Sequence, residues 1–148
     1  MLESILVGTD GSHTAAVAVA QAVDIARAFG ARLQIVSAYE PVTERHIRTG
    51  RLHAPADLEW AVNPREDVLE VLDSARSDAE AAGVTEVETF ARVGDAADAI
   101  LDVAEEQRAD LIVVGHKGMT GATRFLLGSI PNKVSHHAPC SVLIVRTG

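Results

Sequence analysis

Short apolar runs alternate with longer helical segments along the chain, and this alternation most limits how the chain can fold. Runs typical of buried strands cover residues 4–8, 32–38, 85–92, 111–114 and 141–145. Helical patterns separate them at residues 13–29, 63–83, 95–104 and 129–137. Strands that alternate with helices pair in parallel through right-handed crossovers. We therefore predict one doubly wound α/β domain over residues 1–148, with helices on both faces of a parallel sheet.

Several helix boundaries are marked by capping residues. Ser12 is placed as an N-cap after a short turn, and Gly30 as the left-handed residue that stops the first helix. The segment 63–66, Asn-Pro-Arg-Glu, combines an N-cap, a proline at the first helical position and a carboxylate three residues beyond the cap. We expect helices to begin directly after Ser12 and after Asn63.

The connection at residues 39–63 is long for so short a chain and has no clear hydrophobic period. Prolines and a glycine interrupt it, so we predict a flap that could include a short helix. Arg45, Arg48 and Arg51 make the flap locally basic. Two interpretations stay open, namely a solvated loop and a lid that closes over a phosphate group.

The formal net charge of −8 limits the partners that the protein can bind. Nucleic acids and anionic membranes are held chiefly by clustered Lys and Arg, so we expect neither as a partner. No run approaches the roughly 20 apolar residues that cross a bilayer, and the first residues lack the positive charge of a signal peptide. We expect a cytoplasmic protein. Its only lysines are Lys117 and Lys133, so helix N-termini and backbone amides are the better candidates for holding a phosphate.

The single cysteine and the six histidines carry weak functional signals. Cys140 precedes the apolar run 141–145, which predicts a place beside a buried strand and not a reactive thiol. The histidines show no spacing typical of metal ligands.

Two loops have the content of a phosphate-binding site. Ligands of doubly wound sheets bind outside the carboxyl ends of the strands, where the strand order reverses. Residues 8–12 follow the first strand and read Gly-Thr-Asp-Gly-Ser, while Gly115, Gly118 and Gly128-Ser129 form the pattern G-x2-G-x9-G-[ST] after the fourth. Glycines let successive backbone amides approach one anion, and Gly128-Ser129 starts a helix whose dipole favours negative charge.

This pattern, the opening Val-Gly-Thr-Asp-Gly-Ser and the closing Pro-Cys-Ser-Val-Leu-Ile-Val-Arg resemble the nucleotide-binding branch of the universal stress protein family over essentially the whole chain. The resemblance implies a five-stranded parallel sheet in the order 3-2-1-4-5. It also implies that Asp10 faces the ribose and the metal-bound phosphates, and that the backbone of Ala38 reads the adenine edge. The expected nucleotide site comprises Thr9, Asp10, Ala38, Gly115, His116, Lys117, Gly118, Gly128, Ser129 and Ile130.

The start of the last helix bears on which nucleotide is bound. Pro131 follows Ile130 where family members often carry a small hydroxyl residue. Proline is compatible with a first helical turn, but it removes one potential phosphate donor. Some family members with a similar Gly-Ser-x-Pro helix start bind cyclic AMP. We expect ATP with magnesium, which Asp10 would contact indirectly, and cyclic AMP and AMP stay open as alternatives.

The motifs and the family resemblance are compatible with three classes of function. The first is a stress-related sensor or regulator that binds an adenine nucleotide. The second is a slow ATPase, since Asp10 with magnesium could polarise a phosphate, although no general base is evident. The third is a dimeric scaffold without nucleotide. Residues 140–146 form an apolar last strand that lies at a sheet edge in the implied order, and an exposed apolar edge favours pairing with a second copy.

Overall fold

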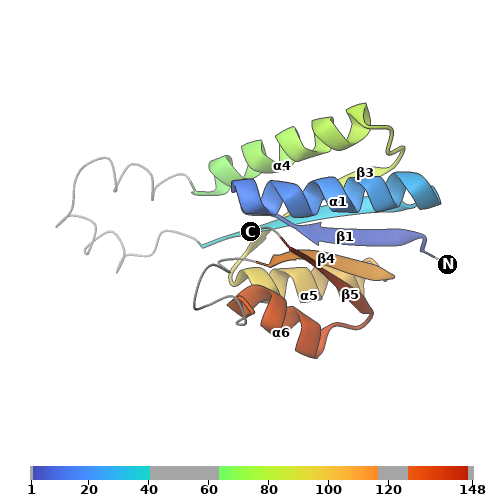
Figure 1. Cartoon of the computed structure of the whole chain (residues 1–148). Coiled ribbons are helices and arrows are strands. Elements are labelled where there is room, and N and C mark those ends of the chain that lie inside the picture. Colours follow the sequence, from blue (N-terminus) through green and yellow to red (C-terminus); the bar gives the residue numbers. More distant parts are fainter. Residues whose placement is uncertain (1, 41–63, 117–126, 147–148) are drawn as a thin grey trace.

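A five-stranded parallel sheet forms the centre of the protein, as seen in a computed structural model that describes residues 2–40, 64–116 and 127–146 (Figure 1). The strand order is β3-β2-β1-β4-β5, so the expected order 3-2-1-4-5 is confirmed. The strands are β1 (Ser4–Gly8), β2 (Arg32–Tyr39), β3 (Val87–Val93), β4 (Leu111–His116) and β5 (Ser141–Arg146). The helices are α1 (His13–Phe29), α4 (Pro64–Ala81), α5 (Ala96–Glu106) and α6 (Ser129–His137).

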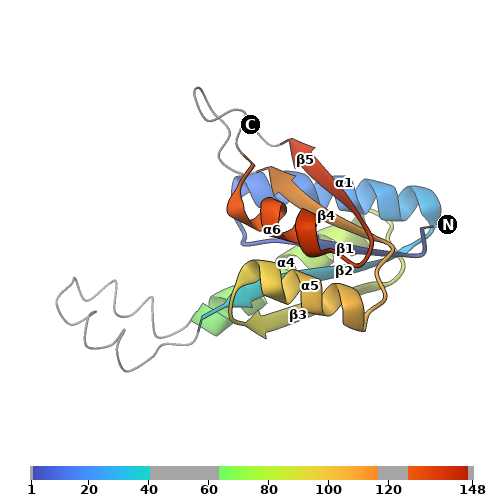
Figure 2. The same ribbon diagram turned by 90° about the horizontal axis from the view of Figure 1, so that it is seen from below.

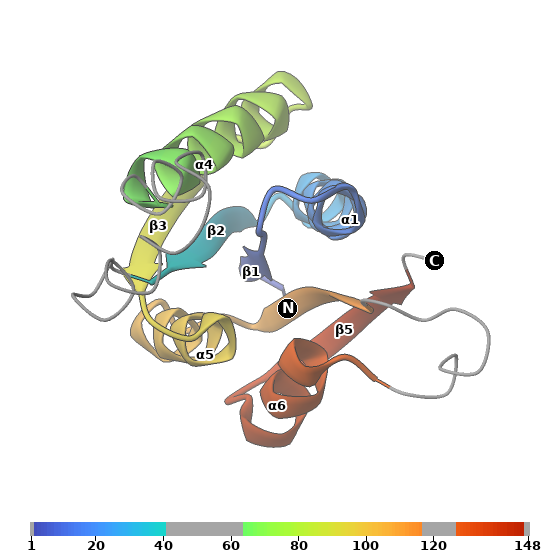
Figure 3. The same cartoon turned by 90° about the vertical axis from the view of Figure 1, so that its left-hand side faces the viewer.

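The helices cover both faces of the sheet, as the alternation of strands and helices predicted. Helices α1 and α4 lie on one face, and α5 and α6 lie on the other (Figure 3). Figure 2 shows α5 and α6 on the same side, and the two helices contact each other. The doubly wound α/β class is thereby confirmed.

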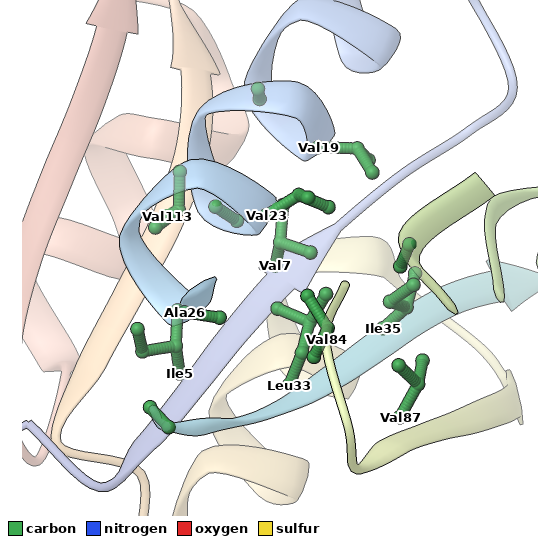
Figure 4. Close-up of a cluster of buried hydrophobic side chains, with 14 of the residues drawn as sticks. Ile5, Val7, Val19, Val23, Ala26, Leu33, Ile35, Val84, Val87 and Val113 are labelled. Carbon is green, nitrogen blue, oxygen red and sulfur yellow. The ribbon is translucent and has the colours of Figure 1, made fainter. Parts of the chain in front are cut away.

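Each face of the sheet buries its own apolar core, because successive side chains of a strand point to opposite faces. Ile5 and Val7 of β1 point toward α1 and pack with Val23 (Figure 4). Leu6, between them in the sequence, packs in the other core with Val103 of α5. The central strands β1 and β4 are buried on both faces, which explains their continuous apolar sequences.

The predicted helix signals act as expected where they are described. The Ser12 side chain caps α1 by accepting a hydrogen bond from the amide of Ala15 at 3.2 Å. Gly30 stops the same helix in the left-handed conformation, with φ of 64°. In addition to these two signals, the side chain of Asp95 caps α5 by accepting a hydrogen bond from the amide of Asp98 at 3.1 Å.

Some predicted strand boundaries differ from those of the structure. Strand β3 begins at Val87 and not at residue 85, and it ends at Val93. Strand β2 runs on to Tyr39, which pairs with Val93 and whose carbonyl accepts a hydrogen bond from Gly94 at 2.8 Å. Tyr39 therefore belongs to the sheet and not to the predicted flap. The remainder of that flap, residues 41–63, lies outside the described residues.

The last strand differs from its predicted burial. Strand β5 is an edge strand that pairs with β4, and most of its side chains are half-buried or exposed, with only Val145 buried. An edge strand packs fewer neighbours than a central one, so a continuous apolar run did not lead to full burial here. Beside it, partial burial raises the pKa of the Cys140 thiol, which is consistent with an unreactive cysteine.

One carboxylate ties the start of β1 to the start of β4. Asp110 accepts hydrogen bonds from the amides of Glu3 at 2.9 Å and Ser4 at 3.0 Å. Its own amide donates to the carbonyl of Ser4 at 2.8 Å. The bond from Glu3, followed by that from Ser4, outweighs desolvation and lowers the pKa of Asp110. The ionised carboxylate thus stabilises the start of the sheet.

We expect Asp110→Asn to lower the free energy of unfolding near neutral pH. A carboxylate with a depressed folded-state pKa contributes stability above its unfolded pKa of about 3.9, and this contribution is lost as pH falls through the folded pKa. The difference between the wild type and the variant should therefore shrink on acidification. Urea unfolding across this pH range measures it. Asp73→Asn on the exposed surface of α4 is the control, and a pH-independent difference for Asp110→Asn would contradict the assignment.

Candidate functional site

A cavity of about 260 Å³ lies at the carboxyl ends of the central strands. Its walls come from the loop after β1, the end of β2, the first turn of α5, the end of β4 and the first turn of α6. Because β1 lies between β2 and β4, and the chain crosses to opposite faces from these strands, this is the reversal point of the sheet. The cavity is where a doubly wound fold places a ligand.

Most of the predicted site residues meet at this cavity. The described residues of the expected site that line it are Thr9, Asp10, Ala38, Gly115, Gly128, Ser129 and Ile130. They come from four separate segments of the chain. His116 is half-buried at the end of β4 and is not among the described residues lining the cavity. Lys117 and Gly118 lie outside the described residues.

The loop after β1 is held in a tight turn by its own side chains. The Thr9 hydroxyl accepts from the amide of Gly11 at 3.1 Å, and the Asp10 carboxylate accepts from the amide of Ser12 at 2.9 Å. The amide of Thr9 donates to the carbonyl of Val36 on β2 at 3.0 Å. These bonds fix the backbone on which the exposed Asp10 side chain stands at the cavity edge.

The first turn of α6 lines one side of the cavity. Gly128 is the N-cap and has an extended backbone, with φ of −60° and ψ of 159°. Its carbonyl accepts the first helical bond, from the amide of Asn132 at 3.0 Å. The amides of Ser129 and Ile130 precede that bond and have no intrahelical acceptor, while Pro131 has no amide hydrogen. Two amides and the positive end of the helix dipole therefore face the cavity region.

An ion-pair cluster holds α6 against the start of α5. Lys133 contacts Asp98 at 2.8 Å and Asp95 at 3.4 Å. The hydrogen bond to Asp98 raises the pKa of Lys133, and the backbone bond from Asp98 lowers the pKa of Asp95. These groups are exposed, so the cluster adds orientation more than stability. Sequence reasoning missed Lys133, because its partners lie more than thirty residues away and no local spacing reports the pairing.

The apolar walls of the cavity were also missed. Val36, Ile100 and Val114 line it together with Ser37. A Cβ atom on Gly8 would lie 2.7 Å from Ile100 Cδ1, so glycine at the end of β1 allows α5 to approach the cavity closely. The sequence did contain a signal for these walls. Val36 and Val114 lie in the carboxyl-terminal halves of β2 and β4, close to the edge of the sheet where ligands bind. Such walls suit the flat face of an aromatic ligand.

Metal-ligating side chains are few among the described residues that line the cavity. Among residues 2–40, 64–116 and 127–146, no three His, Cys, Asp or Glu side chains lie together in a way that would hold a metal ion. Asp10 is the one carboxylate among the described residues that line the cavity. A single carboxylate together with phosphate oxygens is a donor set that magnesium accepts. The site thus fits a magnesium ion carried by a nucleotide.

Fold and cavity together define a doubly wound α/β protein with a cavity at its strand-order reversal. The sequence profile of the universal stress protein family matches residues 1–146. The chain belongs to this family, as its motifs indicated.

Relatives and solved structures match over nearly full length. Universal stress protein Rv1636 of Mycobacterium tuberculosis is 39% identical over 145 residues, which are 98% of this chain and 97% of the relative. A crystal structure of a universal stress protein in complex with cAMP is 36% identical, with a TM-score of 0.76 and 99% of each chain covered. UspA from Lactobacillus plantarum is 26% identical, with a TM-score of 0.77 and 98% of each chain covered.

None of the helices in the described part of the chain combines the length and the apolar character needed to cross a bilayer.

We expect Gly11→Ala to destabilise the turn beside the cavity for two separable reasons. Gly11 has φ of 81°, and an added Cβ would lie 2.8 Å from Val71 Cγ2 of α4. Positive φ alone costs about 1–2 kcal/mol for alanine. Gly30→Ala is the matched control, because Gly30 also has positive φ but has no atom within 4 Å of the added Cβ.

Urea unfolding should show a larger loss for Gly11→Ala than for Gly30→Ala, by about 1 kcal/mol for the steric contact. Val71→Ala makes room for the added Cβ, so the double variant should lose less stability than the sum of the two single variants. The double-mutant cycle measures this difference as a favourable interaction energy. Equal losses at the two glycines, with no interaction energy, would show that the contact between the turn and α4 is unimportant.

Proposed function

We propose that the protein binds an adenine nucleotide in the cavity and acts as a nucleotide-dependent regulator in the stress response. The observation that carries this proposal is the convergence of the Asp10 turn and the first turn of α6 on one cavity with apolar walls. Such a cavity offers a surface for a base, a carboxylate for a ribose and free amides for a phosphate. The family membership supports the same conclusion.

The proposed ligand would lie with its base toward β2. In this arrangement the backbone of Ala38 meets the adenine edge, while Val36 and Ile100 contact the ring face. Asp10 accepts hydrogen bonds from the ribose hydroxyls. The amides of Ser129 and Ile130 then hold the phosphate, which explains how a protein of net charge −8 can bind an anion at one point of its surface.

Cyclic AMP is the first ligand to test, and ATP with magnesium is the second. Pro131 is buried and lines the cavity where a further amide would otherwise stand in the first turn of α6. Two donors suit one phosphate group better than a chain of three. The crystal structure of the 36% identical universal stress protein contains cAMP. When ATP is bound, magnesium would neutralise its phosphates, and Asp10 would orient the metal through its hydration shell.

A regulator is favoured over an enzyme by the composition of the cavity. Hydrolysis needs a group that positions or deprotonates water. No histidine is among the described residues that line the cavity, and Asp10 is their one carboxylate. Asp10 already accepts the amide of Ser12, so it is suited to holding a ligand. We therefore propose that ATP turnover is slow.

We further propose that the protein forms a homodimer through β5 in the cytoplasm. This strand lies at the edge of the sheet and leaves Val142, Leu143 and Ile144 only half-buried. Pairing with a second copy would cover both the apolar side chains and the open backbone edge. The other edge strand, β3, is flanked by the exposed pair of Arg92 and Glu106, which makes it less suited to such pairing.

Gly128→Val is expected to weaken nucleotide binding at least tenfold while leaving the fold intact. The φ of −60° at Gly128 is available to any residue, so the added side chain changes access to the cavity and not the backbone. Calorimetric titration of nucleotide-free protein with cyclic AMP, and separately with ATP plus magnesium, measures the affinity. Ala28→Val on the exposed face of α1 is the control.

The same preparations test the choice between regulator and enzyme. Phosphate release from ATP should stay slow in the wild type and in Asp10→Ala. Fast release that Asp10→Ala abolishes would favour an ATPase. The absence of binding by either nucleotide would leave a dimeric scaffold as the better account.

Dimerisation through β5 predicts that Leu143→Lys gives a monomer while the wild type is a dimer. A lysine at the half-buried position places charge on the apolar edge. Light scattering at micromolar concentration measures the mass. Val93→Lys on exposed β3 serves as the matched edge-strand control and should leave the dimer intact. A monomeric wild type would contradict the interface.

A further inference from the structure

A second depression, separate from the nucleotide cavity, runs between α1 and α4 on the same face of the sheet. It encloses about 550 Å³, and its two walls are helices. Small and medium apolar side chains line it, including Ala16, Ala20, Val71 and Ala75. Ala16 and Ala20 are exposed although they are apolar, so the groove is open to solvent. Figure 3 shows α1 nearly end-on and α4 running obliquely beside it, on the same face of the sheet.

Among the described residues that line this groove, the charged side chains are all acidic. Asp24 of α1 and Glu70 and Asp78 of α4 are exposed along it. Arg27 pairs with Asp24 at 3.4 Å and donates to the carbonyl of Ala82 at 3.3 Å, so it offsets part of the charge at one end. Glu70 and Asp78 remain as the dominant charges. A ligand that fills the groove must therefore be apolar on one side and cationic at its margins.

The groove and the nucleotide cavity share one segment of the chain. Thr9 and Ser12 line both. Between them, Asp10 faces the cavity, and Gly11 lines the groove and contacts Val71 so closely that a Cβ would lie 2.8 Å from Val71 Cγ2. The turn that would hold the ribose is thus also the end wall of the groove.

We propose that the groove between α1 and α4 docks a cationic amphipathic helix of a partner protein, and that the turn at residues 9–12 couples this docking to the nucleotide site. Apolar side chains of the partner helix would fill the space over Ala16, Ala20 and Ala75, and its lysines or arginines would flank Glu70 and Asp78. The docking surface stands on the groove alone. The coupling rests on the proposed nucleotide binding.

The shape and charge of the groove favour a cationic helix over nucleic acids and lipids as the partner. Two helical walls with small residues at spacings of three and four accept the ridge of a third helix. Nucleic acids and anionic lipids would meet uncompensated carboxylates and be repelled. A cationic partner, in contrast, would lower the electrostatic cost of bringing an anionic nucleotide to the cavity, because the turn at residues 9–12 lines both spaces. The coupling should therefore be positive.

A designed peptide provides the probe. It is a fluorescent helix of about 14 residues, roughly 21 Å long, with leucine and alanine on one face and lysines at its margins. Its counterpart carries glutamate at each lysine position. Fluorescence anisotropy with the whole protein should show binding of the lysine peptide and not of the glutamate peptide. A short DNA duplex tests the alternative class of partner.

Two double variants separate the groove from general charge. The double variant Glu70→Lys and Asp78→Lys reverses the charge of the groove and should weaken binding of the lysine peptide at least tenfold. Asp73→Lys with Asp102→Lys makes the same change of net charge at exposed positions outside the groove and should leave affinity within about twofold. Ala20→Phe should block the groove, whereas Ala28→Phe, on exposed α1 outside it, should not. Thermal unfolding of each variant confirms that it is folded.

Equal weakening by both double variants, no peptide binding, or preferred binding of DNA would overturn the docking surface. Peptide affinity that rises severalfold with saturating cyclic AMP or ATP would support the coupling, and an unchanged affinity in nucleotide-bound protein would overturn it. If nucleotide fails to bind while the peptide still binds at the groove, the proposed nucleotide function fails and the docking surface stands.

Discussion

Parallel hydrogen bonding of β1 on both of its edges is the constraint on which the remaining structure depends. Residues Ser4–Gly8 pair with β2, and Ile5, Leu6 and Val7 pair with β4. The chain first builds outward to β3 on one side and then returns to build β4 and β5 on the other. The crossover helices consequently leave β1 and β4 toward opposite faces. The strand order therefore creates the cavity between them, and the local sequence decides only which residues line it.

The proposed phosphate site is compatible with an acidic chain because its donors are backbone amides. Several of its basic side chains are engaged in exposed ion pairs away from the cavity, such as Lys133 with Asp98 and Arg92 with Glu106. The amides of Ser129 and Ile130 need no cationic side chain, since the α6 dipole already favours negative charge there. Lys133 contributes indirectly, because its contacts with α5 fix the direction in which that helix end points.

The features predicted from the sequence were those encoded locally. Continuous apolar runs identified β1 and β4, caps such as Ser12 and Gly30 marked helix ends, and glycines marked the loops. What the sequence did not reveal depended on pairing between distant segments. The extension of β2 to Tyr39 requires its partner Val93, and the exposure of β5 follows from its edge position. The contact of Ile100 with the end of β1 likewise arises only once α5 has packed on the sheet.

The turn after β1 shows how one short segment can serve two surfaces. Its backbone is fixed by hydrogen bonds to its own side chains and by the hydrogen bond from the Thr9 amide to β2. A displacement of one residue of the turn therefore displaces its neighbour as well. Asp10 and Gly11 face different spaces, one bounded by α6 and the other by α4. Movement of Asp10 toward a bound ribose would therefore change the packing of Gly11 on Val71. Because linkage is reciprocal, a partner that alters this contact should also alter nucleotide binding at the proposed site.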